Sequence, residues 1–580
     1  MIAGQVAINS QFQINGSADW TVCSTSNTWT QTIIQGANGS LILGANDALA
    51  TNARVTWDSA TAGALDLAGY SQTIGGLDCS AAPTYPSLGV GNSSTQSDSV
   101  LKIKGGTYTF AGRLMDAIGG GNRKLALELL SGTQTLTGDN SYSGLTTISG
   151  GTLNIGAGGA NGSISNSASI INNSALVFNR SDAFVVTNEI SGAGNLTLRG
   201  AVIARPRNSS ALGAGTIAVS VGTAQADTSH VELTGGITLT NPLTFGSRAY
   251  PSTFAPHYVN VSGNNVLDPP ADLTLASGGN VISLQSDSGR LVLTKGVTTA
   301  AGAPRWLAVQ GAGDGEVQGT LSLNMAVFKG GAGVWALSDS SPMGGPTVVS
   351  NGTLVLKGSL TAPANQVTIA GGTLAGNGTI AGPVTVAADG TLAPGISVGT
   401  LTIRNNLSLE GRAVMEISRN GPVLANDLVA GVDTLTYGGT LVVTNIGGSA
   451  LQVGDSFQLF AATNYAASDF ANIVYPVGYT FTNTLAVDGR IWVESAPAGT
   501  TPPNFPPGGM ARLPDGSVSL TATGAVGAAY SLWASTNVAL TPIMSTWTRL
   551  SSGTVTGSPF TILDNTATNF QERFYLFSTP

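Results

Sequence analysis

The sequence predicts an all-β protein in which a long parallel β-solenoid is followed by a small antiparallel β-sandwich. The tripeptide Gly-Thr-Leu occurs seven times, and it recurs at a nearly constant spacing from Gly352 to Gly372 to Gly390. Short runs of Thr, Val, Ile and Leu alternate with Gly and Asn, as in extended strands joined by sharp turns. No segment of any length has a helical period.

The repeat is longest in residues 144–155, which align without gaps on residues 345–356. A circuit of about 20 residues cannot close an apolar core alone, but stacked circuits bury a continuous apolar column. We therefore expect residues 21–445 to form a solenoid of roughly 20 rungs, about 4.8 Å apart.

Two runs carry a resemblance to a known family. They are LTGDNSYSGLTTISGGTLNIG (136–156) and LVFNRSDAFVVTNEISGAGNLTLRG (176–200), and both resemble the autotransporter-associated β-strand repeat of secreted bacterial surface proteins. Residues 370–411 resemble the last rungs of those proteins, and residues 454–470 resemble the capping region after the rungs. The resemblance covers most of residues 30–495. It implies a right-handed parallel β-helix outside the cell, and it implies no activity.

The composition excludes several classes of protein. Charged residues make up 9% of the chain, against about 25% in typical globular proteins. The apolar share of 42% is too high for a disordered chain. The net charge of −8 argues against nucleic acid as a partner, because nucleic acid requires clusters of Lys and Arg. No apolar run reaches the length of about 18 residues that a membrane helix needs.

Residues 1–20 differ from the rungs. Val6, Ile8, Phe12 and Ile14 alternate with polar residues, a period-2 pattern that predicts a half-buried strand. This strand either caps the first rung of its own chain or pairs with another molecule, since an open solenoid end exposes unpaired backbone.

The chain has two cysteines, Cys23 and Cys79. In a secreted chain they are expected to pair and pin the first rungs, by roughly 4 kcal/mol in the chain-entropy model. The alternative is two independent buried thiols. The first residues lack the basic and apolar regions of a signal peptide, so we expect that peptide to have been removed.

The C-terminal part has its own pattern. Residues 446–495 are expected to cap the solenoid, and residues 496–509 read as a Pro/Gly linker. Residues 510–580 contain alternating strands with frequent turns, which predict a β-sandwich. This last unit resembles the C-terminal domain of secreted proteins from the Verrucomicrobia and Planctomycetes group. The amphipathic strands of a membrane barrel do not follow, so we do not expect autotransport by a barrel of its own.

Few residue patterns in the chain resemble a catalytic or metal site. His230 and His257 lie in the less regular segment 201–306 without a partner motif, and such histidines are far more often structural than catalytic. No GxSxG elbow with supporting His and Asp occurs. Glycine-rich strings are expected by chance in a chain with 78 glycines.

Two carboxylate pairs are candidate sites. Asp427 and Asp433 are close in the sequence, and Asp314 and Glu316 are two positions apart, which places the second pair on one face of a strand. Solvated turns explain both pairs better than catalysis or calcium binding. We therefore expect no catalytic residues, no metal and no cofactor.

Two hypotheses for function follow. The first is an extracellular structural protein, a rigid rod that forms head-to-tail homopolymers, filaments or a surface layer and adheres to other surface proteins. The second is a polysaccharide-binding or polysaccharide-degrading β-helix. It requires a line of exposed acidic or aromatic residues on successive rungs, within residues 201–306.

Overall fold

The structure is a computed structural model. It describes residues 1–2, 4, 10–35, 39–57, 63–79, 89–219, 227–246, 248, 254–275, 281–299, 305–466, 469–496, 502–540 and 543–579. The fold is all-β with about 2% helix, and the predicted parallel β-solenoid is confirmed, with about 16 turns. Contacts divide the chain into two compact units, Met1–Ile396 with Leu401–Gly411, and Ser397–Thr400 with Arg412–Pro580.

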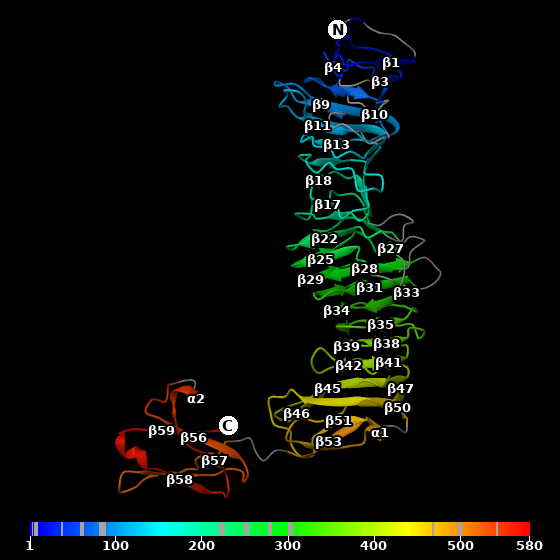
Figure 1. Ribbon diagram of the computed structural model, residues 1–580. Coiled ribbons are helices and arrows are strands. Elements are labelled where there is room, and N and C mark those ends of the chain that lie inside the picture. The colour runs from blue at the N-terminus through cyan, green and yellow to red at the C-terminus, as the bar shows by residue number, and fades with distance from the viewer. Residues whose placement is uncertain are drawn as a thin grey trace. The chain divides into compact units, whose positions relative to one another are not determined.

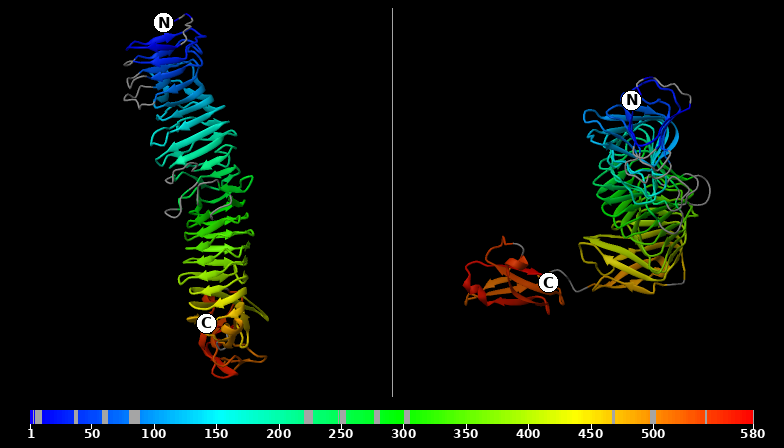
Figure 2. Two further views of the ribbon diagram at one scale, coloured as in Figure 1. Left: turned by 90° about the vertical axis from the view of Figure 1, so that its right-hand side faces the viewer. Right: turned by 45° about the horizontal axis from the view of Figure 1, so that its top comes forward.

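Among the described strands of the first unit, the ladders between neighbouring rungs are parallel, and the rungs stack one on the next (Figure 1, Figure 2). Its first rungs form two sheets. One contains β1 (Gln11–Ile14), β3 (Gln31–Ile34), β5 (Arg54–Trp57) and β8 (Gly76–Asp78). The other contains β2 (Trp20–Val22), β4 (Leu41–Leu43), β6 (Ala64–Asp66), β9 (Gly89–Asn92) and β11 (Arg113–Ala117).

Three longer sheets follow. The first contains β7 (Gln72–Ile74), β10 (Ser99–Phe110), β12 (Leu125–Leu136), β13 (Thr146–Ile148), β14 (Thr152–Ile155), β15 (Ile170–Asn172), β16 (Ala175–Arg180), β18 (Ile190–Ser191), β19 (Asn195–Gly200), β21 (Ile217–Val219), β24 (Leu243–Phe245), β27 (Leu273–Leu275) and β30 (Val297–Thr299).

The second contains β17 (Val185–Val186), β20 (Ile203–Ala204), β22 (His230–Thr234), β25 (Tyr258–Ser262), β28 (Val281–Ser286), β31 (Arg305–Gln310), β33 (Met325–Lys329), β35 (Thr347–Val349), β37 (Ser359–Leu360), β38 (Val367–Ile369), β40 (Thr379–Ile380), β41 (Val384–Val386), β43 (Thr400–Ile403) and β44 (Leu407–Leu409). The third contains β23 (Thr238–Leu239), β26 (Asn264–Leu267), β29 (Arg290–Leu293), β32 (Asp314–Val317), β34 (Val334–Leu337), β36 (Thr353–Leu356), β39 (Thr373–Gly376) and β42 (Thr391–Pro394).

The Gly-Thr-Leu repeat sets the register of the stack. Leu354 of β36 aligns with Leu374 of β39, which aligns with Leu392 of β42, and all three are buried inside the coil. The preceding Gly352 has a φ of +63°, and a Cβ there would clash with the carbonyl oxygen of Gly331 in the rung before. Glycine is therefore required at this turn by both its backbone conformation and its close contact.

The less regular segment 201–306 consists of longer rungs. Val231 aligns with Tyr258 and Tyr258 with Leu284, and each of these circuits is longer than the one that aligns Thr353 with Thr373. The strands of these longer circuits still pair in parallel, with one register shift between Leu233 and Thr234 of β22. The solenoid therefore has fewer turns than the roughly 20 that a constant period predicts.

The second unit begins with rungs of the same kind. It contains β45 (Arg412–Asn420), β46 (Val423–Asn426), β47 (Leu428–Thr436), β48 (Thr440–Asn445), β50 (Phe460–Tyr465) and β51 (Asn472–Val474). β50 and β51 still pair in parallel with β47 and β48, within the segment predicted as a cap. Antiparallel pairing follows in β49 (Ser456–Gln458), β52 (Thr480–Asn483) and β53 (Arg490–Ser495), with the short helix α1 (Leu485–Asp488).

The C-terminal residues form the predicted antiparallel sandwich. Its sheets are β54 (Met510–Arg512), β55 (Val518–Ala522) and β58 (Phe560–Asp564), and β56 (Ala529–Ser535), β57 (Thr548–Thr554) and β59 (Phe574–Ser578). Two short helical segments, α2 (Ile543–Thr546) and the 3₁₀ turn η1 (Asn565–Asn569), complete it. Within the segment predicted as a linker, Asn504 exchanges backbone hydrogen bonds of 2.9 and 3.0 Å with Thr523 of the sandwich.

Candidate binding surface

The outer face of β20, β22 and β25 carries the main polar cluster of the segment 201–306. Along β22 the side chains alternate, with Val231 and Leu233 buried inside the coil and His230 and Glu232 directed outward. Arg205 follows β20 directly and reaches the same outward side as Glu232, one rung away. Strand alternation therefore brings together charged groups that are distant in the sequence.

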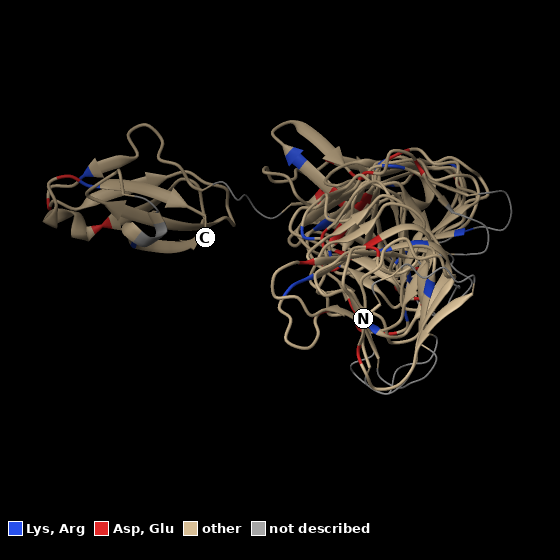
Figure 3. Cartoon of the chain, turned by 90° about the horizontal axis from the view of Figure 1, so that it is seen from above, with Lys and Arg blue, Asp and Glu red and all other residues tan. Residues whose placement is uncertain are grey.

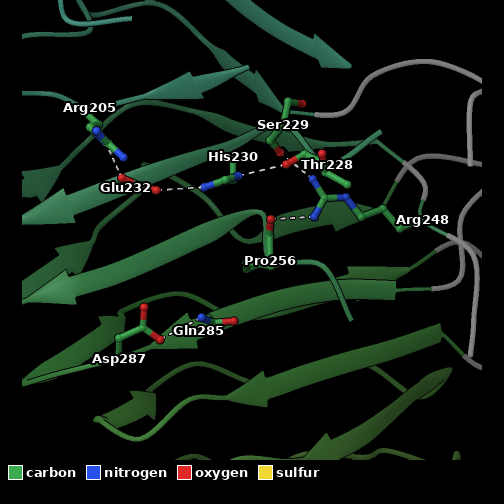
Figure 4. Close-up of polar contacts among 9 residues, drawn as sticks. All are labelled: Arg205, Thr228, Ser229, His230, Glu232, Arg248, Pro256, Gln285 and Asp287. Atoms are coloured by element: carbon green, nitrogen blue, oxygen red, sulfur yellow. Dashed lines mark hydrogen bonds and ion pairs between the residues drawn. The ribbon is translucent and has the colours of Figure 1, made fainter. Parts of the chain in front are cut away.

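Figure 4 shows how these groups meet. Glu232 Oε1 lies 3.2 Å from His230 Nε2, and Glu232 Oε2 accepts a hydrogen bond from Arg205 Nε. His230 Nδ1 lies 2.9 Å from the carbonyl oxygen of Thr228. A carbonyl oxygen can only accept, so Nδ1 is the donor of that bond.

The carboxylate of Glu232 is suited to ion pairing with neighbouring side chains rather than to proton transfer. Burial raises the pKa of its carboxyl, but the contacts with Arg205 and His230, led by the hydrogen bond from Arg205, outweigh burial and hold that pKa below its usual value. The carboxylate is thus ionised at neutral pH and already paired. A general acid would need the opposite shift.

Part of this face is covered by the segment that precedes β25. Phe254 stacks on Phe328 of β33 with ring centroids 4.4 Å apart, and its carbonyl oxygen accepts hydrogen bonds from Ser283 and Gln310. Beneath it His257 is fully buried, and burial, with the nearby positive charge of Arg248, holds its pKa well below the usual value. His257 is a structural residue, as the sequence predicted.

Among the described residues, the line of exposed acidic or aromatic side chains that a polysaccharide groove would need does not form on this face. The outward positions after Glu232 are Val259, Gln285 and Gln310. Figure 3 likewise shows Lys, Arg, Asp and Glu scattered over the described chain, without a face taken by one sign.

A separate cleft of about 200 Å³ lies at one corner of the solenoid, in residues 165–211. Its lining comes from three successive rungs, because Ile170 aligns with Ile190 and Ile190 with Leu212. The lining residues are Ser165, Ser167, Ala168, Thr187, Asn188, Glu189, Arg207, Asn208 and Ala211. Hydroxyl and amide groups dominate, with one carboxylate and one guanidinium.

Asp314 and Glu316 do lie on one strand, β32, but basic side chains already balance the negative charge of Glu316. Its carboxylate contacts Arg290 of the preceding rung and Lys357 two rungs later, and it accepts a hydrogen bond from Ser338. Burial raises its pKa, and hydrogen bonds from Lys357, Ser338 and Gln318 nevertheless lower it to about 2. This cluster ties successive rungs together.

The other pair does not form a site either. Asp427 is buried, and its carboxyl accepts hydrogen bonds from the backbone N–H groups of Gly399 and Glu416 at 2.9 and 2.7 Å. Burial raises its pKa to about 6. Asp433, on β47, is exposed. In the described part of the chain no group of three His, Cys, Asp or Glu side chains is placed to hold a metal ion.

The predicted N-terminal strand is the first strand of the stack. Phe12 and Ile14 lie on β1, which pairs in parallel with β3 and ends its sheet. Ile14 is buried and Phe12 is half-buried. Val6 and Ile8 lie outside the described residues.

The structure does not form the predicted disulfide between Cys23 and Cys79, which are both thiols. Cys23 follows β2 of the first rung, whereas Cys79 follows β8 of the fourth. Three rungs at about 4.8 Å each separate them by roughly 14 Å along the stack. The Cα atoms of a disulfide lie within about 7 Å of each other.

Two segments, residues 131–155 and 327–356, match the family model described as the passenger-associated-transport repeat. Both segments are thus similar to passenger repeats. In the first of these repeats Thr133 pairs with Thr152, and in the second Val334 pairs with Thr353, so each repeat contains one complete turn and the strand that closes it. No curated protein matches the chain.

The passenger repeats and the β-solenoid together support a passenger-like β-helix of the kind that autotransporters carry, which fits a secreted or surface protein. No helix in the described residues is long and apolar enough to cross a membrane. Sequence reasoning identified the repeats but missed Arg205, Glu232 and the corner cleft. The run Arg205-Pro-Arg207 is visible in the sequence as a break in the rung pattern, without a sign of its partners.

Proposed function

We propose that this protein is an extracellular scaffold, a passenger-like solenoid that associates with further copies through its first rung and adheres through its outer faces. The proposal rests on the finding that each matched sequence repeat corresponds to one turn of the solenoid. Each passenger repeat is one closed turn, and turns of this kind stack in register along the chain. Such a stack is stabilised by neighbour contacts alone and can be extended by an added rung.

The ionisable groups support a structural role over catalysis. Glu232 and Glu316 are each ionised and paired with basic side chains from other rungs. Such ladders hold rungs together and leave no free acid and base side by side at these positions, as hydrolysis of a glycosidic bond would require. A degradative function therefore has less support than a structural one.

The first rung supports association between copies. β1 stands at the end of its sheet, and its exposed Gln11 and Gln13 face outward. Gln13 already donates a side-chain hydrogen bond to Gln35 of the next rung. A strand from a second copy would extend this amide ladder, as stacked Gln side chains do in cross-β assemblies.

Sedimentation velocity over a range of protein concentrations tests the association. The full chain should form larger species as its concentration rises, and Gln11→Lys with Gln13→Lys should keep it monomeric, since added charges on an edge strand oppose its pairing with a strand of another copy. Gln96→Lys with Gln366→Lys adds the same charge at exposed positions away from β1 and should behave as the wild type. Equal assembly of both double variants, or none by the wild type, would refute the role of β1.

The extracellular location has its own test. Antibodies raised against the purified protein should label intact cells of the producing organism in immunogold microscopy. Labelling that appears only after the cells are permeabilised would contradict it.

A further inference from the structure

The corner cleft in residues 165–211 contains two charged side chains that the rest of the fold does not use. Arg207 and Glu189 are both exposed, and within the described chain neither side chain has a hydrogen bond or ion pair, including with each other. Arg205, at the other side of Pro206, is paired with Glu232. The cleft therefore holds a guanidinium and a carboxylate that can both bind a ligand.

The floor of the cleft is built from fixed polar groups. Asn188 donates hydrogen bonds to the carbonyl oxygens of Ile164 and Ser167, 3.3 and 3.2 Å away in the preceding rung. Ser167 is buried and hydrogen-bonded to Thr146 at 2.9 Å. Asn208 accepts hydrogen bonds from the backbone and hydroxyl of Ser210, which leaves its amide N–H groups for a ligand. The walls are thus pre-formed, which reduces the entropy lost on binding.

The chemistry of the lining favours a sugar. Hydroxyl and amide groups bind the hydroxyls of a pyranose ring, and Glu189 adds a strong acceptor. The lining spans three successive rungs, which lie about 4.8 Å apart along the axis. Among the described residues no aromatic side chain lines the cleft, so stacking cannot supply the affinity for a neutral sugar.

We propose that this cleft binds an acidic polysaccharide, with Arg207 holding the carboxylate of a uronic acid unit. Hydroxyl groups only exchange one set of hydrogen bonds with water for another, and their net contribution is small. A bidentate pair between a guanidinium and a carboxylate is stronger and directional. The charge on the ligand therefore decides the affinity. This binding site is independent of the association through the first rung.

Isothermal titration calorimetry on the full chain tests the proposal with two matched probes. Tetra-β-1,4-glucuronate and cellotetraose share the same backbone and differ in a carboxylate at each unit. We expect the glucuronate to bind and cellotetraose to bind at least about tenfold more weakly. Affinity should fall as salt rises, because the cleft is open to solvent.

Two single substitutions locate the site. Arg207→Gln should weaken glucuronate binding by about tenfold or more, the effect of losing one charge-assisted pair. Arg199→Gln removes the same charge from an exposed side chain on β19, outside the cleft lining, and should leave binding within about twofold of the wild type. Equal loss in both variants would show general electrostatic attraction instead. That result, equal binding of cellotetraose, or no glucuronate binding would overturn the proposal.

Discussion

The ring of Phe12 stacks on the indole of Trp29, with centroids 4.8 Å apart and planes inclined by 24°. Phe12 lies on β1 and Trp29 comes just before β3, so the contact joins the first rung to the second. Trp29 is buried and donates a 2.8 Å hydrogen bond from Nε1 to the hydroxyl of Thr32. The first strand is thus anchored to the stack by its inward face.

This contact predicts a local effect of Phe12→Ala. Loss of a half-buried aromatic ring should cost about 1–2 kcal/mol at the first rung. Rungs of a solenoid contact only their neighbours, so the loss should remain local. Hydrogen exchange should accelerate in residues 10–35 and remain unchanged in residues 305–411. Uniformly faster exchange along the chain would contradict this account, and Gln11→Ala, which removes an exposed side chain, serves as control.

Lys329 predicts a second effect, inside a passenger repeat. Its side chain is fully buried, and its ammonium donates to the carbonyl oxygens of Gly330, Gly331 and Asn351 at 2.7, 2.7 and 2.9 Å. Lys329→Met should leave these acceptors without their donor and cost about 3 kcal/mol. Chemical denaturation measures that loss. A loss below about 1 kcal/mol would show that water replaces the ammonium.

Glu316 predicts a dependence on acid. Its folded pKa of about 2 lies below the usual value of 4.5, so its stabilisation is complete above about pH 4.5 and is lost as the pH falls toward 2. The shift corresponds to at most about 3 kcal/mol, and solvent screening at the partly exposed Arg290 and Lys357 reduces it. Between about pH 5 and pH 3 the wild type should therefore lose more stability than Glu316→Gln, as measured by urea denaturation.

A partner substitution checks the cause of that shift. Lys357 is 2.8 Å from Glu316, and Lys357→Met should move the acid-induced loss to a higher pH. Identical profiles for the wild type and both variants would show that the cluster contributes no stability that depends on pH.

Asp427 predicts a pH dependence of stability that is opposite in sign to that of Glu316. Burial raises its folded pKa to about 6, above the usual value of 3.8, so the folded state binds the proton more tightly than the unfolded state. The contribution of this group to stability is greatest below about pH 4 and falls as the pH rises through about 6. The neighbouring carboxylate of Glu416 also raises the pKa of Asp427, because two negative charges side by side repel each other. Oε2 of Glu416 is buried without a hydrogen-bond partner among the described residues.

Thermal unfolding at about pH 5 and about pH 7 tests this sign. The second unit should be less stable at the higher pH by at most about 1 kcal/mol in the wild type, because most of the interval between the two pKa values lies below pH 5. In Asp427→Asn that difference should be much smaller, although the variant also loses one of two acceptors for the backbone N–H groups of Gly399 and Glu416. A variant with the full wild-type difference would assign the pH effect to another group.

The regular rungs could be predicted from sequence because one tripeptide fixes both the turn and the inward residue. Gly352 provides the turn conformation and Leu354 fills the core, so the spacing of Gly-Thr-Leu indicates the register directly. The sandwich was predictable for a similar reason, since its strands alternate with period 2.

The polar clusters could not be predicted because they depend on circuits of unequal length. Arg205 meets Glu232 across one of the longer circuits, whereas Glu316 meets Lys357 across two rungs. A constant period of about 20 residues places the first pair out of register. No sequence pattern indicates that Asp427 is buried, because its burial depends on the antiparallel hairpin of β45 and β46.

Electron microscopy of the purified full chain, across a range of concentrations and without added ligand, tests the central claim most directly. The account predicts filaments whose number rises with concentration and which are absent from the Gln11→Lys, Gln13→Lys variant. Dispersed single particles of the wild type at every concentration would contradict an assembling scaffold.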